Sequence, residues 1–381
     1  MKIDADFECG NIIVQELTDT GAILSIRPDT ETDYFQWFYF RVTGAPDIAR
    51  TFKFANAGEA RYEKAWQYYQ VVASYDEKNW FRVPTEYDGS TLTVKHTAVE
   101  STTSYAFFVP YLTAQREALL QECESSLLVT RHSIGRSYLG KQLDMVEIGD
   151  AVHPVRKIWV QSRQHAGESM AEWATEGLIK RLLDPLDSAS HALLSKAKVY
   201  VVPNINPDGS ALGNLRANAA GVDPNRSWAE PNDKIPEIVA IQKAMKEIGV
   251  DLFLDMHGDE ERPFIWIGHP DVNQSTTAKQ IQHQLAEELA ERNPEIRPAP
   301  KEYGEVVTQK TSRTDNLSFA SNWVASTFNC PALITELPFA KPAHMSEDTM
   351  LQEGCLRFGR TCVEALNVVV HQFEKENWRE N

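Results

Sequence analysis

The chain has 381 residues, of which 42 % are hydrophobic, and this suits a globular protein of two domains better than one small domain. Its net charge of −16 disfavours a nucleic-acid partner, because phosphate backbones are bound by clustered lysine and arginine. No apolar run is long enough to cross a membrane, and the N-terminus lacks the apolar core of a signal peptide.

The five cysteines are spread along the chain and form no CxxC pair. Such a pattern is typical of reduced thiols and not of a disulfide framework. We therefore expect a soluble, cytoplasmic protein, and the sequence makes no prediction of its oligomeric state.

Short runs rich in aromatic and β-branched residues occupy the first part of the chain, with Gly, Pro, Asp or Asn between them. Examples are "GAILSIRP", "TFKFANAG", "STLTVKHTAV" and "TSYAFFVPYL". Several short strands at such spacing predict an antiparallel β-sandwich. We assign this domain to residues 1–120 and expect it to pack against the rest of the chain as a structural partner.

Beyond this region, apolar strands alternate with amphipathic helices. The predicted strands are "KIWVQS", "KVYVVPNI", "VDLFLDMHG" and "ALITELP". The segment "LTAQREALLQECESS" has a helical propensity, and further helices are predicted at 168–183, 234–248, 276–292 and 346–374. This alternation predicts an α/β domain over residues 121–381, with a mixed, largely parallel sheet covered by helices on both faces.

Polar residues stand at the carboxyl ends of successive predicted strands, where open α/β sheets collect their functional groups. His165 and Glu168 follow the first strand, Asp255 and His257 end a later one, and Glu336 lies on the last. Two histidines and a carboxylate that converge at one sheet edge are a common ligand set for a catalytic zinc. The Pro-Asp-Gly of "NPDG" is also a plain turn signal, so Asp208 can be read either way.

The spacing HxxE occurs three times, so it is weak by itself: His165–Glu168, His257–Glu260 and His344–Glu347. Only the first pair straddles a strand end and a helix start, where Glu168 could cap the helix and face a metal. We interpret Glu260, in the charged run "GDEER", as part of a solvated loop. His344 precedes Ser346, Glu347 and Asp348, which we interpret as a helix cap and acidic first turn.

The segments "HAGE", "NPDG", "GNLRANAAGVDPNRSW", "DMHG" and "ITELPF" stand in the order seen in zinc carboxypeptidases of the funnelin (carboxypeptidase A-like) superfamily. The resemblance covers roughly residues 125–375 by motif, and the β-rich first domain is similar in character to that of the cytosolic carboxypeptidases. It implies that His165, Glu168 and His257 hold one zinc ion per chain, and that Glu336 is the general base.

The same resemblance assigns roles to four more residues. Arg216 matches the arginine that polarises the scissile carbonyl. Asn225 and Arg226 match the pair that holds the terminal carboxylate of a peptide or protein substrate. Asp223 matches a carboxylate that orients a zinc-bound histidine.

One feature departs from the family pattern. The extracellular carboxypeptidases place a tyrosine about twenty residues before the glutamate base, whereas the stretch "QKTSRTDNLSFASNW" here has none, and Tyr303 upstream has no assignable role. Lys310 and Arg313 in this region could make the side-chain pocket basic, although a Lys/Arg pair in a loop more commonly lies on the surface. The cytosolic branch removes acidic C-terminal residues, so we expect a preference for glutamate.

Two other functions remain open at this stage. A zinc amidohydrolase acting on N-acyl amino acids, like aspartoacylase or succinylglutamate desuccinylase, would use the same HxxE…H ligands and glutamate base. A binding protein on the same fold would have lost a ligand or the base, and this sequence retains all of them.

Overall fold

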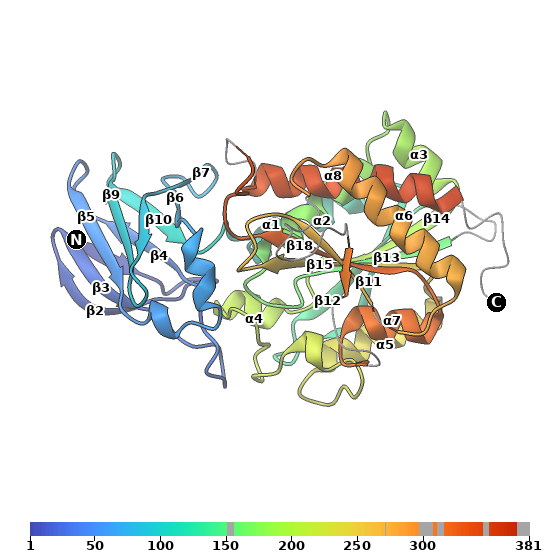
Figure 1. Cartoon of the computed structure of the whole chain (residues 1–381), viewed down its shortest axis with the longest axis horizontal. Helices are drawn as coiled ribbons and strands as arrows, with labels where there is room; N and C mark the ends of the chain where they lie inside the picture. The colour runs from blue at the N-terminus through green and yellow to red at the C-terminus, as the bar shows by residue number, and fades with distance from the viewer. Residues whose placement is uncertain (151–155, 271, 297–307, 311–315, 346–349, 372–381) are drawn as a thin grey trace.

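A computed structural model describes residues 1–150, 156–270, 272–296, 308–310, 316–345 and 350–371. It contains two regions side by side, a β-rich domain at the N-terminus and a larger domain of alternating strands and helices (Figure 1). Within those ranges, no helix is long and apolar enough to span a membrane. All five cysteines are buried and none forms a disulfide, as expected for reduced thiols.

The N-terminal domain contains two five-stranded sheets. One has the order β1 (Lys2–Asp4), β4 (Tyr39–Thr43), β10 (Thr102–Ala106), β6 (Val72–Ser74) and β7 (Trp80–Arg82). The other has the order β2 (Ile13–Thr18), β3 (Gly21–Ser25), β5 (Ala49–Phe54), β9 (Leu92–Thr97) and β8 (Thr85–Tyr87). Aromatic rings from the two sheets meet in the core, where Phe40 lies 6.1 Å from Phe54 between ring centroids.

This domain is the predicted sandwich, with one correction to its pairing. Strands β3 and β5 run parallel, while the other pairs of the two sheets are antiparallel. The parallel pair arises because β4, which lies between them in sequence, belongs to the other sheet. A connection through a second layer can return a strand in the same direction, and no local pattern reports that.

The second domain is built on an eight-stranded mixed sheet. Its order is β11 (Val129–Arg136), β12 (Gln142–Ile148), β14 (Ala197–Val202), β13 (Arg156–Ser162), β15 (Leu252–Asp259), β18 (Ala332–Pro338), β16 (Trp266–His269) and β17 (Thr308–Lys310). The four central strands β14, β13, β15 and β18 are mutually parallel. Their carboxyl ends therefore meet at one edge, as the sequence predicts.

Helices cover both faces of this sheet. They are α1 (Thr113–Glu124), α2 (Ser169–Leu182), α3 (Ser188–Leu194), α4 (Pro207–Leu212), α5 (Pro236–Ile248), α6 (Thr276–Arg292), α7 (Ala320–Phe328) and α8 (Gln352–Val370). In Figure 1, α8 lies above the sheet, whereas α5 and α7 lie below it. The predicted helices at 168–183, 234–248 and 276–292 are confirmed to within two residues at each end.

Helices α2 and α8 pack unusually close together. A Cβ added at Gly359 would lie 1.7 Å from the carbonyl oxygen of Ala174, and one at Gly177 would lie 2.0 Å from that of Leu356. Only glycine permits this approach, because any side chain would push the helices apart. The contact fixes α2, whose N-terminus carries Glu168, against α8.

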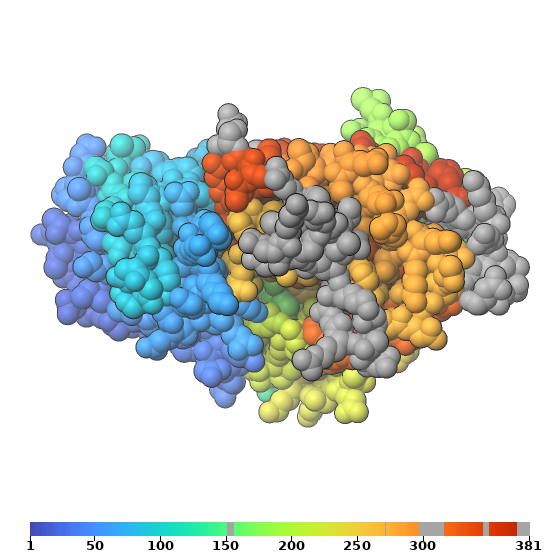
Figure 2. All heavy atoms as spheres, viewed as in Figure 1, coloured from blue at the N-terminus to red at the C-terminus, as the bar shows by residue number. Residues whose placement is uncertain are grey.

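The two domains are joined by polar and aromatic contacts. The Asp29 carboxylate accepts hydrogen bonds from the backbone N–H groups of Leu215, Arg216 and Ala217, at 2.5, 2.7 and 2.9 Å. Phe107 stacks on Phe339 with ring centroids 4.5 Å apart. In Figure 2 the atoms of the two domains meet along a continuous border. The division predicted at residue 120 falls within α1 and stays a prediction.

Candidate active site

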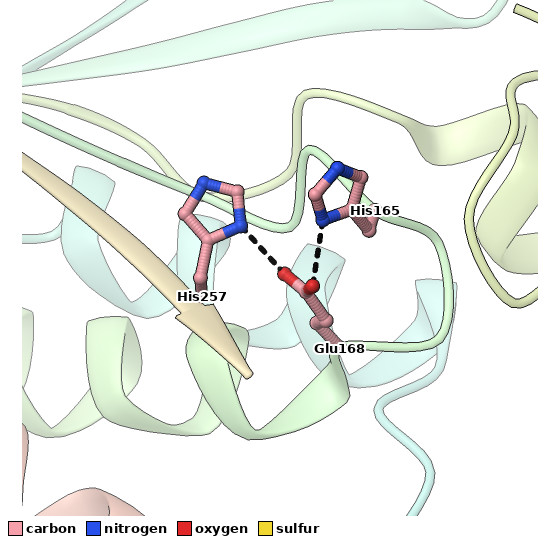
Figure 3. Close-up of side chains that lie close together, drawn as sticks. All are labelled: His165, Glu168 and His257. Atoms are coloured by element: carbon pink, nitrogen blue, oxygen red, sulfur yellow. Dashed lines mark hydrogen bonds and ion pairs between the residues drawn. The ribbon is translucent and has the colours of Figure 1, made fainter. Parts of the chain in front are cut away.

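Three buried side chains converge at the carboxyl edge of the central strands. His165 lies in the turn after β13, Glu168 stands immediately before α2, and His257 lies near the end of β15. The Nδ1 atom of His165 is 2.6 Å from Glu168 Oε1, and that of His257 is 2.8 Å from Glu168 Oε2 (Figure 3). One ligand atom from each residue lies within 4.8 Å of the others.

The turn that carries His165 is held by a buried arginine. The backbone of Arg163 has a positive φ of 57°, a conformation that residues other than glycine seldom adopt. Its guanidinium donates to the carbonyl of Tyr111 and to Glu172 Oε2, each at 2.7 Å, and to the Ala166 carbonyl at 2.9 Å. These contacts stabilise the sharp turn from strand to helix, so that His165 and Glu168 face the same point.

Glu168 occupies the N-cap position of α2, but its side chain makes no capping hydrogen bond. The expectation that it caps the first turn is therefore wrong in part, because both carboxylate oxygens point at histidines instead. Burial acts to raise the pKa of Glu168, yet the charges of His165 and His257 outweigh it and lower the pKa to about 2.

An aspartate lies behind each histidine. Asp223 Oδ1 is 3.2 Å from His165 Nε2, and Asp255 Oδ2 is 3.2 Å from His257 Nε2. The Nε2–H groups donate to these carboxylates, which leaves both Nδ1 atoms facing Glu168. Asp223 was predicted to orient a histidine, whereas Asp255 had no predicted role. The signal was present, because residues two apart on a strand share one face.

Arg216 is buried beside Asp223, with 6 % of its surface exposed. Its Nε donates to Asp223 Oδ2 at 2.7 Å, and its Nη1 donates to the hydroxyl of Tyr62 at 2.8 Å. Burial would lower the pKa of Arg216, but the nearby Asp223 carboxylate raises it above its ordinary value. The guanidinium is therefore held charged and fixed in orientation.

Asn225 and Arg226 lie in a short 3₁₀ helix, Pro224–Arg226. Asn225 Oδ1 accepts from the backbone N–H of Ala320 at 2.9 Å. The Arg226 guanidinium lies 4.1 Å above the centre of the Phe319 ring and donates to the carbonyl of Asn225 at 2.7 Å. Both side chains are thus positioned by contacts with the chain around α7.

Six of the predicted residues line one cavity of about 200 Å³. Glu336 reaches it from β18, where it is paired in register with His257. Burial and the nearby Glu168 raise the pKa of Glu336 well above its ordinary value, against the effect of His257. The cavity thus collects the predicted residues His165, Glu168, Arg216, Asn225, Arg226 and Glu336.

Several lining residues had no role in the sequence analysis: Tyr62, Asp259, Glu260, Glu261, Trp266 and Phe319. Tyr62 belongs to the N-terminal domain, and no local pattern connects it with Arg216. The interpretation of Glu260 as solvated is wrong, since only 8 % of its surface is exposed and it faces the cavity. A run of charged residues predicts solvent exposure only where none of its side chains lines a cavity.

Some predictions fall outside the described residues. Arg313, Tyr303, Ser346, Glu347 and Asp348 lie there, as does the side chain of Lys310, whose backbone ends β17. The basic pocket and the cap of the last helix are therefore untested. His344 lies apart from the cluster, with Nε2 2.9 Å from the carbonyl oxygen of Pro294.

The cluster fits a zinc ion by its donors and by its surroundings. Two imidazole nitrogens and a carboxylate are the three protein ligands of many catalytic zinc sites, which leave a further position open. His165 and Glu168 line the cavity, so that position would face substrate. The aspartates behind the histidines fix the tautomers that such coordination requires.

Comparisons with known proteins agree with this geometry. Residues 3–108 match the cytosolic carboxypeptidase N-terminal domain family, and residues 117–353 match the zinc carboxypeptidase family. Cytosolic carboxypeptidase 6 of Caenorhabditis elegans is 28 % identical over 69 % of this chain, and the match spans 63 % of the worm protein.

Two solved bacterial structures are similar over nearly the whole chain. A metallo-carboxypeptidase from Burkholderia cenocepacia is 33 % identical, with a TM-score of 0.92 over 98 % of this chain and 99 % of the other. One from Pseudomonas aeruginosa, in complex with (2-guanidinoethylmercapto)succinic acid, is 37 % identical, with a TM-score of 0.90 over 98 % and 100 % of the two chains. This chain therefore belongs to the zinc carboxypeptidase family and is a metallocarboxypeptidase, a hydrolase of peptides.

Proposed function

We propose that the protein removes single residues from the C-termini of peptides or proteins, and that His165, Glu168 and His257 hold one zinc ion for this reaction. The observation that carries the proposal is the approach of these three residues beside a cavity that His165 and Glu168 line together with two arginines and Glu336. Zinc bound there would polarise the scissile carbonyl and acidify a water molecule.

Glu336 is the proposed general base. Its carboxyl group faces the cavity from the strand beside His257, within the region where the attacking water would be held. A raised pKa suits this role, because the group must take the proton from water and then give it to the leaving amine nitrogen.

Arg216 is the proposed donor to the scissile carbonyl oxygen. Its Nε and Nη1 atoms are engaged by Asp223 and Tyr62, which leave Nη2 to face the substrate. A fixed, charged donor stabilises the developing oxyanion without having to reorganise during the reaction. Tyr62 would orient this guanidinium from the N-terminal domain.

Arg226, with Asn225, is the proposed anchor for the terminal carboxylate. A planar guanidinium can hold a carboxylate through two parallel hydrogen bonds, and stacking on Phe319 fixes its plane. The succinic acid derivative bound by the Pseudomonas protein also carries carboxylates, which supports an anionic ligand in this cavity.

The identity of the residue removed rests on Lys310 and Arg313. If these side chains line the cavity, they would favour a C-terminal glutamate, and this preference stays a prediction. Hydrolysis of N-acyl amino acids is not favoured, since both family matches and the two bacterial structures are carboxypeptidases. We propose a cytoplasmic site of action, in keeping with five buried cysteines that form no disulfide and with a relative named as cytosolic.

A peptide pool with randomised C-terminal residues tests the proposed activity. Each peptide would be offered with a free and with an amidated C-terminus, and the products weighed by mass spectrometry. We expect metal-dependent loss of one residue from the free-ended peptides alone, with the residues lost reporting the preference. Equal cleavage of amidated peptides would contradict a carboxylate anchor at Arg226, and cleavage of N-acyl amino acids alone would contradict the peptidase assignment.

A further inference from the structure

Glu260 is a buried carboxyl group that no proposed step of hydrolysis uses. It follows β15 and lines the cavity together with Tyr62, Glu168 and Arg216. The cation that acts on it most strongly is Arg216, whose Nε and Nη1 atoms already donate to Asp223 and Tyr62. In the part of the chain that the structure describes, no salt bridge joins Glu260 to a cation.

Such a group is costly to keep without a partner. Burial and the neighbouring Glu168 raise the pKa of Glu260 well above its ordinary value, which reflects how poorly its charge is compensated. The neighbouring carboxylates of the cavity offer Glu260 no counter-charge, and the nearby Arg262 guanidinium donates to Asp259 Oδ2 at 3.2 Å. An unpaired carboxyl group facing a substrate cavity marks a place for a cation or a strong donor.

The position of Glu260 indicates which part of a substrate would meet it. In the proposed function, Arg226 holds the terminal carboxylate and Arg216 holds the scissile carbonyl. Glu260 neighbours Arg216 and Tyr62, and both Arg216 and Glu260 act on the pKa of Tyr62. The scissile carbonyl belongs to the penultimate residue of the substrate. The groups next to it on the N-terminal side are therefore the side chain and the α-nitrogen of that residue.

We propose that Glu260 selects a cationic group on the penultimate residue of the substrate, next to the bond that is cut. The cation is the side chain of lysine or arginine, or the free α-amine of a dipeptide. Each of these groups presents a positive charge and N–H donors. This inference rests on the proposed carboxypeptidase function, and it concerns the penultimate residue, whereas Lys310 and Arg313 concern the terminal one.

The wild-type enzyme can be tested with matched peptides that share one readily removed C-terminal residue. N-acetylated peptides with penultimate lysine, norleucine or glutamate test the side-chain source, since norleucine has nearly the same length as lysine but no charge. A dipeptide with a free α-amine and its N-acetylated form test the second source. We expect kcat/KM to be about tenfold higher for the lysine peptide than for the norleucine peptide, or for the free dipeptide than for its acetylated form. The glutamate peptide should have the lowest kcat/KM.

The variant Glu260→Gln removes the charge and keeps the shape of the side chain. Its readout is the ratio of kcat/KM between the cationic and neutral members of each pair, which does not depend on the fraction of active enzyme. We expect that ratio to fall to about one. Glu261→Gln, which removes an equal charge from the exposed neighbouring residue, should keep most of the ratio, because water screens an exposed carboxylate.

The possible outcomes separate the two proposals. Equal cleavage of cationic and neutral peptides by the wild type, or a ratio that Glu260→Gln leaves unchanged, would overturn the role of Glu260 and leave the carboxypeptidase function standing. Failure to cleave any of these peptides in the presence of zinc would instead overturn the proposed function. Zinc content and circular dichroism of each variant would show that it is folded and loaded.

Discussion

Replacing Asp223 by asparagine should weaken metal binding through the histidine that it touches. The carboxylate accepts from His165 Nε2 at 3.2 Å, from Arg216 Nε at 2.7 Å and from the backbone N–H of Asn225 at 3.0 Å. Asparagine has nearly the same shape, but its amide carries no charge and presents an N–H₂ group to one of these donors. Two charge-assisted contacts are therefore lost at one site.

The expected magnitudes follow from these contacts. Loss of a partner behind a metal-bound histidine typically costs about 10- to 100-fold in metal affinity, and we expect the zinc dissociation constant to rise by that factor. The Arg216 charge also loses its compensation in a site where only 8 % of its side chain is exposed. We expect the free energy of unfolding of the metal-free protein to fall by about 2–4 kcal/mol.

Competition with a chromophoric chelator at neutral pH measures the first quantity, and urea denaturation measures the second. Asp208→Asn is a suitable control, because Asp208 is a buried aspartate that accepts from the backbone N–H of Leu139 at 2.7 Å and lies outside the cavity. The control should lose stability and keep its zinc affinity. A zinc dissociation constant for Asp223→Asn within twofold of the wild type would refute the role of Asp223 as orienter of His165.

Two further predictions concern the same centre. Burial lowers the pKa of His257, but Asp255 and Glu168 outweigh it and raise the pKa well above its ordinary value. Metal-free His257 is therefore an imidazolium at neutral pH, and zinc must displace one of its two ring protons. Zinc affinity should then rise with pH, and binding should release about one proton. Titration calorimetry in buffers of different ionisation enthalpy measures this release, and the release of no proton would contradict the prediction. Tyr62→Phe removes the acceptor that holds Arg216 Nη1 and should lower kcat/KM about tenfold at unchanged zinc content; activity within twofold of the wild type would show that Tyr62 does not orient Arg216.

Local patterns were sufficient to predict the elements that carry the proposed metal site. Helix α6 begins at its predicted residue because Ser275 accepts from the N–H of Ala278, a cap that the sequence itself contains. The central strands are apolar and alternate with helices. This pattern was enough to predict that they run parallel and that their carboxyl ends share one edge of the sheet. His165, Glu168 and His257 lie together for that reason.

The missed features depend on contacts between distant segments. Tyr62 and Arg216 are 154 positions apart and meet only because the N-terminal domain packs against the second one. Glu260 lies in a charged run, and its burial depends on the cavity that the chain after β15 lines together with distant segments. The parallel pairing of β3 with β5 likewise depends on which sheet the intervening strand joins.

The most direct test of the proposed catalytic centre is single-turnover cleavage by Glu336→Gln with its zinc content measured on the same sample. The substitution removes the base and leaves the three proposed ligands in place. We expect full zinc occupancy and a rate about 10²- to 10⁴-fold below that of the wild type, the usual contribution of a positioned acid–base group. Cleavage within tenfold of the wild-type rate, at full zinc occupancy, would contradict the assignment of Glu336 as the base.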